Sequence, residues 1–280
     1  MAIMAQSSDH IRRWTYLVMG IVFFESLLGL IQYGAGPQSF LRMGPGFGTP
    51  SAVGTYANRD HLAGLLEMAL PLSIALLLIS FRGTRTHSVG EALKHQLTSL
   101  RFNSTYIFLI LSIVIILAIL FTQSRAGVSL MLLGIFVVTL LFASRLGFKK
   151  VLGISGTTLF VALIAAIEVG IIPLLNRFIL EDPLKDLRWP MVKESWLGFQ
   201  YFFPFGSGLG TFPQVFERFQ TPDLNGVFVN HAHNDVLEFM FEGGVLACAI
   251  LILFVLSYLR QWWRIWPRGT WHRHHYLQIG

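Results

Sequence analysis

The sequence has little charge and almost no cysteine. Only 13% of its 280 residues are Asp, Glu, Lys or Arg, about half of the ~25% that is typical of soluble domains. Hydrophobic residues make up 54%, and the mean hydropathy is +0.60. The scarcity of charge excludes an ordinary soluble domain, so the net charge of +6 does not indicate a nucleic-acid partner. The single cysteine, Cys248, excludes an intrachain disulfide.

Long apolar runs take the place of the missing charge. Each is near the length that crosses about 30 Å of hydrocarbon at about 1.5 Å per residue. They indicate an all-α polytopic membrane protein, and we expect residues 1–280 to form a single transmembrane domain. About six transmembrane helices are predicted, at 14–33, 61–81, 106–122, 128–143, 151–175 and 236–259.

Basic residues alternate along the chain in a way that predicts its orientation. Thirteen of the 21 lysines and arginines fall before the first run, in every second connection, and after the last run. Because cytoplasmic loops are rich in Lys and Arg, this pattern predicts a cytoplasmic N-terminus. Extracytoplasmic loops are then expected at about 34–60 and 176–235, with a tight turn at 123–127.

The long loop at 176–235 lies between the fifth and sixth predicted transmembrane helices. A loop of this length is uncommon unless it is functional or disordered. Its many aromatic residues argue against disorder. We expect short helices on the outer membrane surface, around 189–199 and 212–219.

Two histidines, His231 and His233, stand with Asn234 where the sixth run begins. Titratable groups at a membrane boundary are costly unless they bind or react with something, and histidine can act as a general base near neutral pH. The His-x-His-x-Asp spacing superficially resembles a two-metal hydrolase site. The next residue should then be histidine but is Val236, so we predict no metal.

Three carboxylates follow the histidines. Asp235 and Glu238 have the spacing of a helix N-cap with a returning Glu. Asp235, Glu238 and Glu242 also fall on one helical face. This face suggests a polar cavity, in which a carboxylate holds the tautomer of a histidine.

Four arginines fall on the predicted outer side. Arg125, at the end of the third run, either extends to lipid headgroups or offers a planar, permanently charged ligand for phosphate. Arg59, Arg188 and Arg218 are either solvated loop charges or, together with Arg125, the lining of a basic cavity for a lipid pyrophosphate.

Gly206, Gly208 and Gly210 alternate within the long loop. No strand–helix context surrounds them, which excludes a dinucleotide-binding fingerprint. We interpret them as a supporting turn that requires positive φ, in preference to a direct phosphate cradle.

Taken together, five stretches resemble the O-antigen ligase / O-antigen polymerase superfamily of bacterial membrane glycosyltransferases. The resemblance implies transfer of a glycan from a polyprenyl-pyrophosphate carrier, such as undecaprenyl pyrophosphate, onto a lipid, sugar or protein hydroxyl. The reaction takes place at the periplasmic face of the inner membrane, in lipopolysaccharide or other cell-envelope polysaccharide biosynthesis, without cofactor or essential metal. The matching stretches are 54–64, 122–127, 188–189, 204–212 and 231–243.

The resemblance also implies roles for single residues. His233 becomes the general base, with His231 in support, and arginines hold the donor pyrophosphate. We add Arg59 and Asn234 to the residues expected to bind the donor. Membrane lipid is expected as a further partner of the chain. The arginines implied by the resemblance are Arg125, Arg188 and Arg218.

Members of this superfamily are typically larger, with around ten or more membrane helices. We therefore interpret the chain as an incomplete version of the larger helical fold. Two alternatives stay open at this point. One is a transporter or channel for an anionic lipid-linked saccharide, which needs the arginines but not His233; the other is an inactive fragment of such an enzyme.

Overall fold

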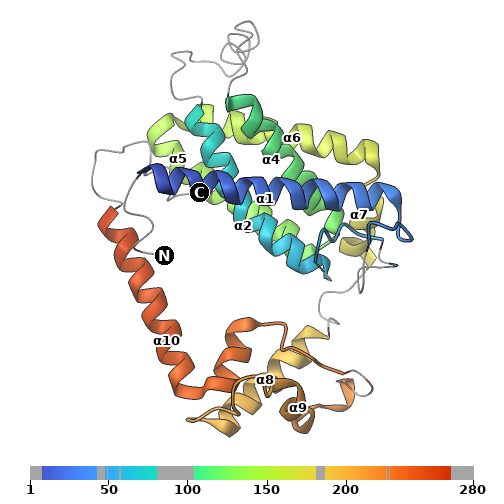
Figure 1. Cartoon of the computed structure of the whole chain (residues 1–280), viewed down its shortest axis with the longest axis vertical. Helices are drawn as coiled ribbons and strands as arrows, with labels where there is room; N and C mark the ends of the chain where they lie inside the picture. Colours follow the sequence, from blue (N-terminus) through green and yellow to red (C-terminus); the bar gives the residue numbers. More distant parts are fainter. Residues whose placement is uncertain are drawn as a thin grey trace, which may run out of the picture. The chain divides into compact units, whose positions relative to one another are not determined.

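The computed structural model describes residues 8–42, 48, 50–56, 58–80, 104–180, 187–224, 226 and 228–265. Every regular element within these ranges is helical (Figure 1), and six helices are long and apolar enough to span a membrane. The chain is therefore an all-α polytopic membrane protein, as predicted. It divides into two compact units, the first ending at Leu180 and the second containing α8 to α10.

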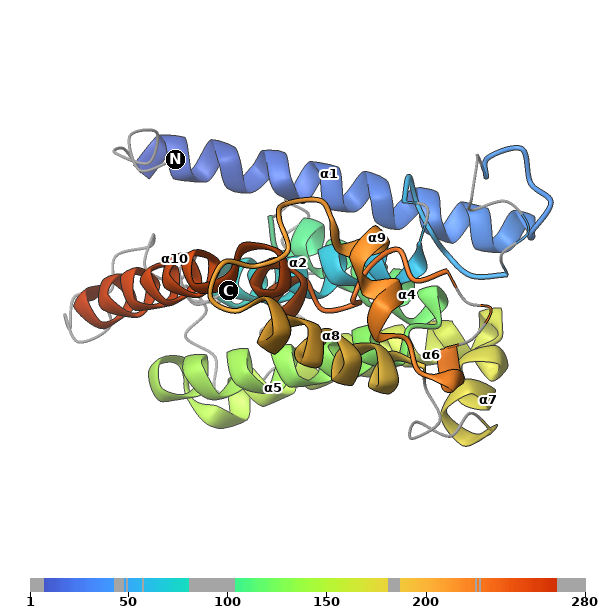
Figure 2. The same ribbon diagram turned by 90° about the horizontal axis from the view of Figure 1, so that it is seen from below.

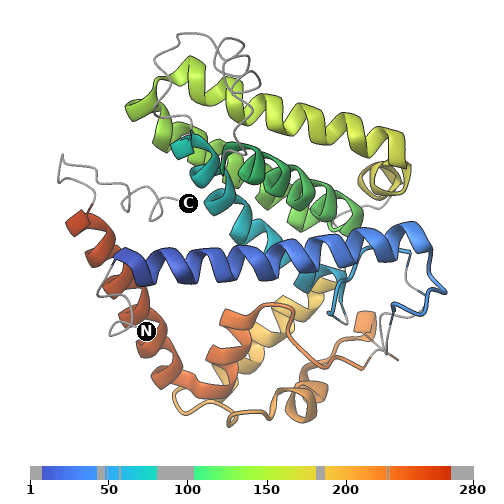
Figure 3. The ribbon, with the colours of Figure 1, turned by 45° about the horizontal axis from the view of Figure 1, so that its top comes forward.

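The first unit is a bundle of membrane helices in layers. α2 and α4 form its centre, with α1 on one side and α5 and α6 on the other (Figures 2 and 3). Burial follows this order. Within the most apolar stretch of each helix, 61% of the residues are buried in α2 and in α4, but only 33–39% in the outer three helices. The helices are α1 (Ser8–Ala35), α2 (Arg59–Ser80), α4 (Ser104–Thr122), α5 (Arg125–Leu146), α6 (Phe148–Val169) and the short α7 (Ile172–Leu180).

Small residues allow α2 and α5 to approach closely. A Cβ atom at Gly127 would lie 2.7 Å from the Cβ of Ala63, and one at Gly134 would lie 3.3 Å from Cγ of Pro71. Both glycines are on α5 and both partners are on α2. This contact explains why small residues follow Arg125 in the sequence, because a larger side chain would separate the two helices.

Several chain segments meet at one end of the bundle. The amide of Ala52, in the loop before α2, donates to the carbonyl of Phe121 at the end of α4 (2.8 Å). Arg177 of α7 donates from Nη1 to the carbonyl of Gln123 in the α4–α5 turn (2.8 Å). The predicted alternation of helix directions requires these segments to share one end. The basic stretches at 82–101 and after residue 265, which also supported the orientation, lie outside the described residues.

The prediction of one helix over 151–175 is wrong in its last part. α6 ends at Val169, and Gly170 adopts φ 108° and ψ 83° in the left-handed region, which glycine tolerates without a Cβ clash. Its carbonyl accepts the Tyr33 hydroxyl of α1 (3.2 Å). The chain then turns into α7.

The second unit is built around aromatic side chains. Phe241 of α10 is fully buried, and its ring contacts those of Phe202, Phe212 and Phe219 at centroid distances of 5.1–6.1 Å. Gly198 leaves room for it, because a Cβ there would overlap the Phe241 ring. The elements are α8 (Arg188–Phe202), α9 (Phe212–Phe216), η3 (Glu217–Phe219), η4 (Pro222–Leu224) and α10 (Asp235–Ile265). The short helices expected around 189–199 and 212–219 are thus present.

The prediction of one unbroken helix over 236–259 is also wrong. α10 is broken at Gly244, which has φ 55° and ψ −137°, and its two arms point in different directions (Figure 1). The backbone at Gly206 approaches so closely that a Cβ on Gly244 would lie 2.6 Å from the Gly206 nitrogen. The first arm, 235–243, therefore belongs to the aromatic core, and only the second arm, 245–265, continues as an apolar helix.

The α2–α5 contact makes a prediction about stability. Gly127→Ala places a methyl group against Ala63 and should destabilise the chain by about 1–3 kcal/mol, as overpacking does in other cores. Gly64→Ala, on α2 with nothing within 4 Å of the new Cβ, is the matched control and should leave stability unchanged or slightly raised. The midpoint of thermal unfolding in detergent, followed by circular dichroism, measures both. Equal midpoints would contradict the contact.

Candidate functional site

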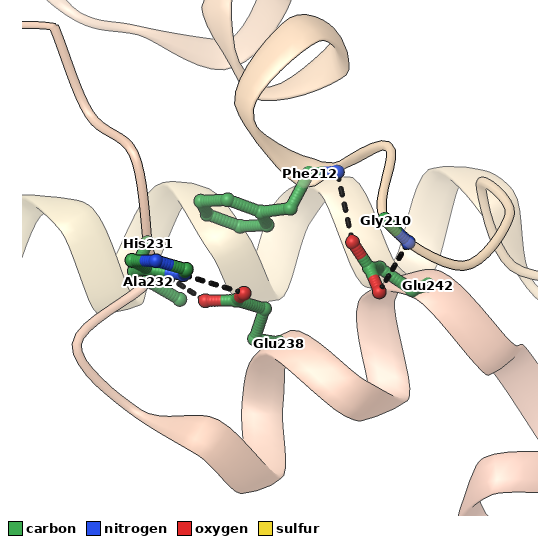
Figure 4. Close-up of polar contacts among 6 residues, drawn as sticks. All are labelled: Gly210, Phe212, His231, Ala232, Glu238 and Glu242. Carbon is green, nitrogen blue, oxygen red and sulfur yellow. Dashed lines mark hydrogen bonds and ion pairs between the residues drawn. The ribbon is translucent and has the colours of Figure 1, made fainter.

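The first arm of α10 presents two different faces. Leu237 and Phe241, four residues apart, are both buried, and Phe241 lies in the aromatic core. Glu238 and Glu242 have the same spacing one position further along, so both carboxylates lie on a neighbouring face. Each carboxylate holds a different loop, as Figure 4 shows.

Glu238 holds the histidine loop through both of its oxygens. Oε1 lies 2.9 Å from Nδ1 of His231, and Oε2 accepts the backbone amide of Ala232 at 2.8 Å (Figure 4). Hydrogen bonds to an ionised carboxylate are stronger than neutral ones. The side chain of Ala232 is fully buried against the aromatic core. This part of the loop is therefore fixed by both packing and polar contacts.

The capping prediction for this helix is wrong in detail. Asn234, not Asp235, caps α10: its Oδ1 accepts the amide of Leu237 at 3.1 Å. Glu238 does not return to the cap, because its carboxylate is bonded to His231 and Ala232. Asp235 is exposed in the first turn of the helix, where a negative charge is favourable.

His233 stands between these two anchored positions, with Ala232 before it and Asn234 after it. It is exposed, and its φ of 53° is in the left-handed region. Histidine visits this region more readily than most residues, but the conformation is still uncommon outside glycine. Side chains held in such conformations concentrate at functional sites. The loop thus presents His233 outward in a defined backbone conformation.

Glu242 holds the glycine loop in the same way. Its Oε2 accepts the amide of Gly210 and its Oε1 that of Phe212, both at 2.9 Å (Figure 4). The amides of Ser207 and Gly208 donate to the carbonyls of Phe241 and Glu242, both at 3.0 Å. The position that an anion would take in a phosphate cradle is therefore filled by a carboxylate of the chain itself.

The three alternating glycines supply the turn that their spacing predicted. Gly206, Gly208 and Gly210 have φ of 79°, 108° and 75°. At Gly206 a Cβ would also overlap the carbonyl of Glu242. Gly206 therefore lets the loop approach α10 closely, whereas Gly208 and Gly210 supply only the positive φ of the turn.

The candidate arginines share a position within their helices. Arg59, Arg125 and Arg188 are the first residues of α2, α5 and α8. Unpaired amides and the helix dipole make a helix N-terminus favourable for anions and unfavourable for cations. Neither α5 nor α8 has an acidic residue in its first turn to offset the arginine. The starts of α5 and α8 thus combine a guanidinium with a positive helix end, whereas α2 carries Asp60 in its first turn.

The candidate arginines and histidines are divided between the two units. Arg59 and Arg125 belong to the first unit, whereas Arg188 and Arg218 belong to the second with the histidines. Arg218 is exposed within η3. In the first unit, Ser124 caps α5 by accepting the Gly127 amide at 3.2 Å, which fixes the turn that carries Arg125.

Sequence reasoning missed two buried charged residues beside this turn. Arg42 donates to the carbonyls of Gly36, Gln32 and Ser51 at 2.7–3.0 Å, and burial lowers the pKa of its guanidinium. In the sequence it has the appearance of one more charge in a loop rich in glycine and proline.

The second is Glu25 of α1, whose carboxylate accepts both the amide (2.9 Å) and the hydroxyl (2.6 Å) of Thr55. Its signal in the sequence is a carboxylate inside an apolar run, and its partner is a loop. Together with Arg42 it fixes the loop that leads to Arg59.

Across the described residues, no three side chains of the metal-binding types His, Cys, Asp and Glu are gathered where they could hold a metal ion.

The helices and this site define a class of protein: a polytopic α-helical membrane protein with a histidine loop and a glycine loop fixed on one broken helix. The family model described as O-antigen ligase matches residues 109–252, which is just over half of the chain. The chain belongs to the O-antigen ligase family, whose members are ligase-type glycosyltransferases that use lipid-linked glycans. No curated protein and no solved structure matches the chain.

The role of Glu242 can be tested by Glu242→Gln. The new amide group keeps one acceptor and turns a donor toward a backbone N–H, which leaves a polar group unsatisfied at a cost of about 1–3 kcal/mol. Hydrogen exchange of residues 206–212 should therefore accelerate by about tenfold or more. Glu217→Gln, at an exposed glutamate of the same unit, is the control. Unchanged exchange in Glu242→Gln would rule out the anchoring role.

Proposed function

We propose that this chain transfers a glycan from a polyprenyl-pyrophosphate carrier to an acceptor hydroxyl at the periplasmic face of the bacterial cytoplasmic membrane. Membership of the O-antigen ligase family supports the reaction class. The observation that carries the proposal is the presentation of His233, which is exposed with a left-handed φ between two anchored residues.

In the proposed reaction His233 acts as the general base. It accepts the proton of the acceptor hydroxyl as the hydroxyl oxygen forms a bond to the anomeric carbon of the donor sugar. The bond from that carbon to the pyrophosphate oxygen breaks, and the polyprenyl pyrophosphate leaves with the electron pair. A base within hydrogen-bond reach of the hydroxyl contributes about 10²–10⁴-fold to such a rate. His231, bonded to Glu238, supports the loop.

Pyrophosphate is a good leaving group, so it needs charge stabilisation more than protonation. We assign this role to Arg59, Arg125, Arg188 and Arg218, with Asn234 nearest the base. Arginine offers planar paired donors and a permanent charge, and three of the four begin a helix. The arginines supply in this scheme the electrostatic stabilisation that a metal ion supplies elsewhere.

The transfer assay uses the chain in proteoliposomes with a polyprenyl-pyrophosphate oligosaccharide and an acceptor glycolipid. His233→Ala should lower transfer by about 100-fold or more while donor affinity is retained. His10→Ala, at an exposed histidine of the first unit, is the control and should transfer normally. Undiminished transfer in His233→Ala would contradict the proposal. Donor flux across the membrane that survives the change would favour a transporter.

Replacing an arginine should, unlike replacing His233, weaken the binding of the donor. Arg125→Ala should weaken donor binding by about tenfold or more, because a charge-assisted contact to phosphate is lost. The same binding assay on His233→Ala separates the two roles. Unchanged donor affinity in Arg125→Ala would remove this residue from the binding set.

A further inference from the structure

The turn of the glycine loop exposes large apolar side chains. Phe205 is 89% exposed and Leu209 is 75% exposed, with Phe203 at 52% beside them. The whole stretch from residue 195 to 216 contains no charged residue. On the water-exposed surface of a protein, apolar patches mark sites of interaction with another protein or with a membrane.

This turn is fastened to α10 at its break. The carbonyl of Pro204 accepts the amide of Val245 at 2.7 Å, which is the first residue of the second arm. The backbones of Gly206 and Gly244 are in close contact, with room for no Cβ at either position. The loop and the start of the second arm therefore form one rigid junction.

The second arm is the part of α10 that is apolar on all sides. Residues 245–265 extend for about 31 Å at ~1.5 Å per residue, close to the thickness of the hydrocarbon core. Its side chains from Val245 and Leu246 onward are mostly exposed, and its only charges, Arg260 and Arg264, lie near the far end. The second arm alone is therefore long enough to cross the hydrocarbon, and the break at Gly244 lies at one end of it.

We propose that Phe205 and Leu209, with Phe203, insert into the lipid interface beside the start of the second arm of α10. The occupant of this surface is the headgroup and upper acyl-chain region of the bilayer, which accommodates aromatic side chains well. The turn is joined to the start of this apolar arm by the hydrogen bond from Val245 to Pro204, and Val245 and Leu246 are themselves exposed. The insertion anchors the glycine loop, and through Glu242 the first arm of α10, at a defined depth.

The test measures depth with a fluorescent label in the full chain, in phosphatidylcholine vesicles. Cys248→Ala removes the only cysteine, and Phe205→Cys or Leu209→Cys then carries an environment-sensitive nitrobenzoxadiazole group. Leu246→Cys, on the second arm, is the membrane reference, and Glu217→Cys, exposed in η3, is the aqueous reference. Quenching by lipids with a nitroxide at acyl carbon 5 is compared with quenching by iodide.

We expect the nitroxide lipid to quench the labels at positions 205 and 209 and iodide to leave them unquenched, as for the label at position 246. The Glu217 label should show the reverse. Iodide quenching at 205 and 209 equal to that at Glu217 would overturn the proposal. Resistance to both quenchers would overturn it too, because protein would then cover the turn. The readout is depth alone, so it is independent of whether the chain transfers a glycan.

Discussion

The second unit depends on two carboxylates four residues apart on the first arm of α10. Glu238 accepts the backbone amide of Ala232 in the histidine loop, and Glu242 accepts that of Phe212 at the end of the glycine loop. On the neighbouring face the same spacing buries Leu237 and Phe241, and Phe241 lies in the aromatic core. One short helix thus fixes two loops, because its polar and apolar faces follow the same period of four.

The first unit fixes its candidate residues by capping and by close helix packing. Ser124 caps α5, and the contact of Gly127 with Ala63 brings α2 and α5 together. Arg59 and Arg125 stand at the starts of these two helices. The same position recurs for Arg188 on α8, so arginines at helix starts are a feature of both units. Anion binding is the function for which such positions are most favourable.

The sequence was sufficient to predict the helices of the bundle, because the length of an apolar run can be read from neighbouring residues alone. It could not predict the breaks at Gly170 and Gly244. Apolar residues continue across both, and the break at Gly244 follows from a contact with Gly206, almost forty residues away. The histidine and glycine motifs were recognised, and a carboxylate was expected to hold a histidine. The bonds from Glu238 and Glu242 to the loop backbones were not predicted. Glu238 had the spacing of a capping residue, and only the fold shows that Asn234 caps the helix and frees Glu238 for the histidine loop.

Glu238 fixes the loop that presents His233, and the steady-state rate of glycan transfer by Glu238→Ala tests the importance of this contact most directly. The change removes both acceptors and leaves His233 in place. We expect kcat to fall by about 100-fold, the cost of a displacement of about 1 Å in a reacting group, while donor affinity is unchanged. Glu217→Ala, at an exposed carboxylate of the same unit, should leave the rate of transfer unchanged. An unchanged kcat in Glu238→Ala would show that this carboxylate does not fix the loop for catalysis.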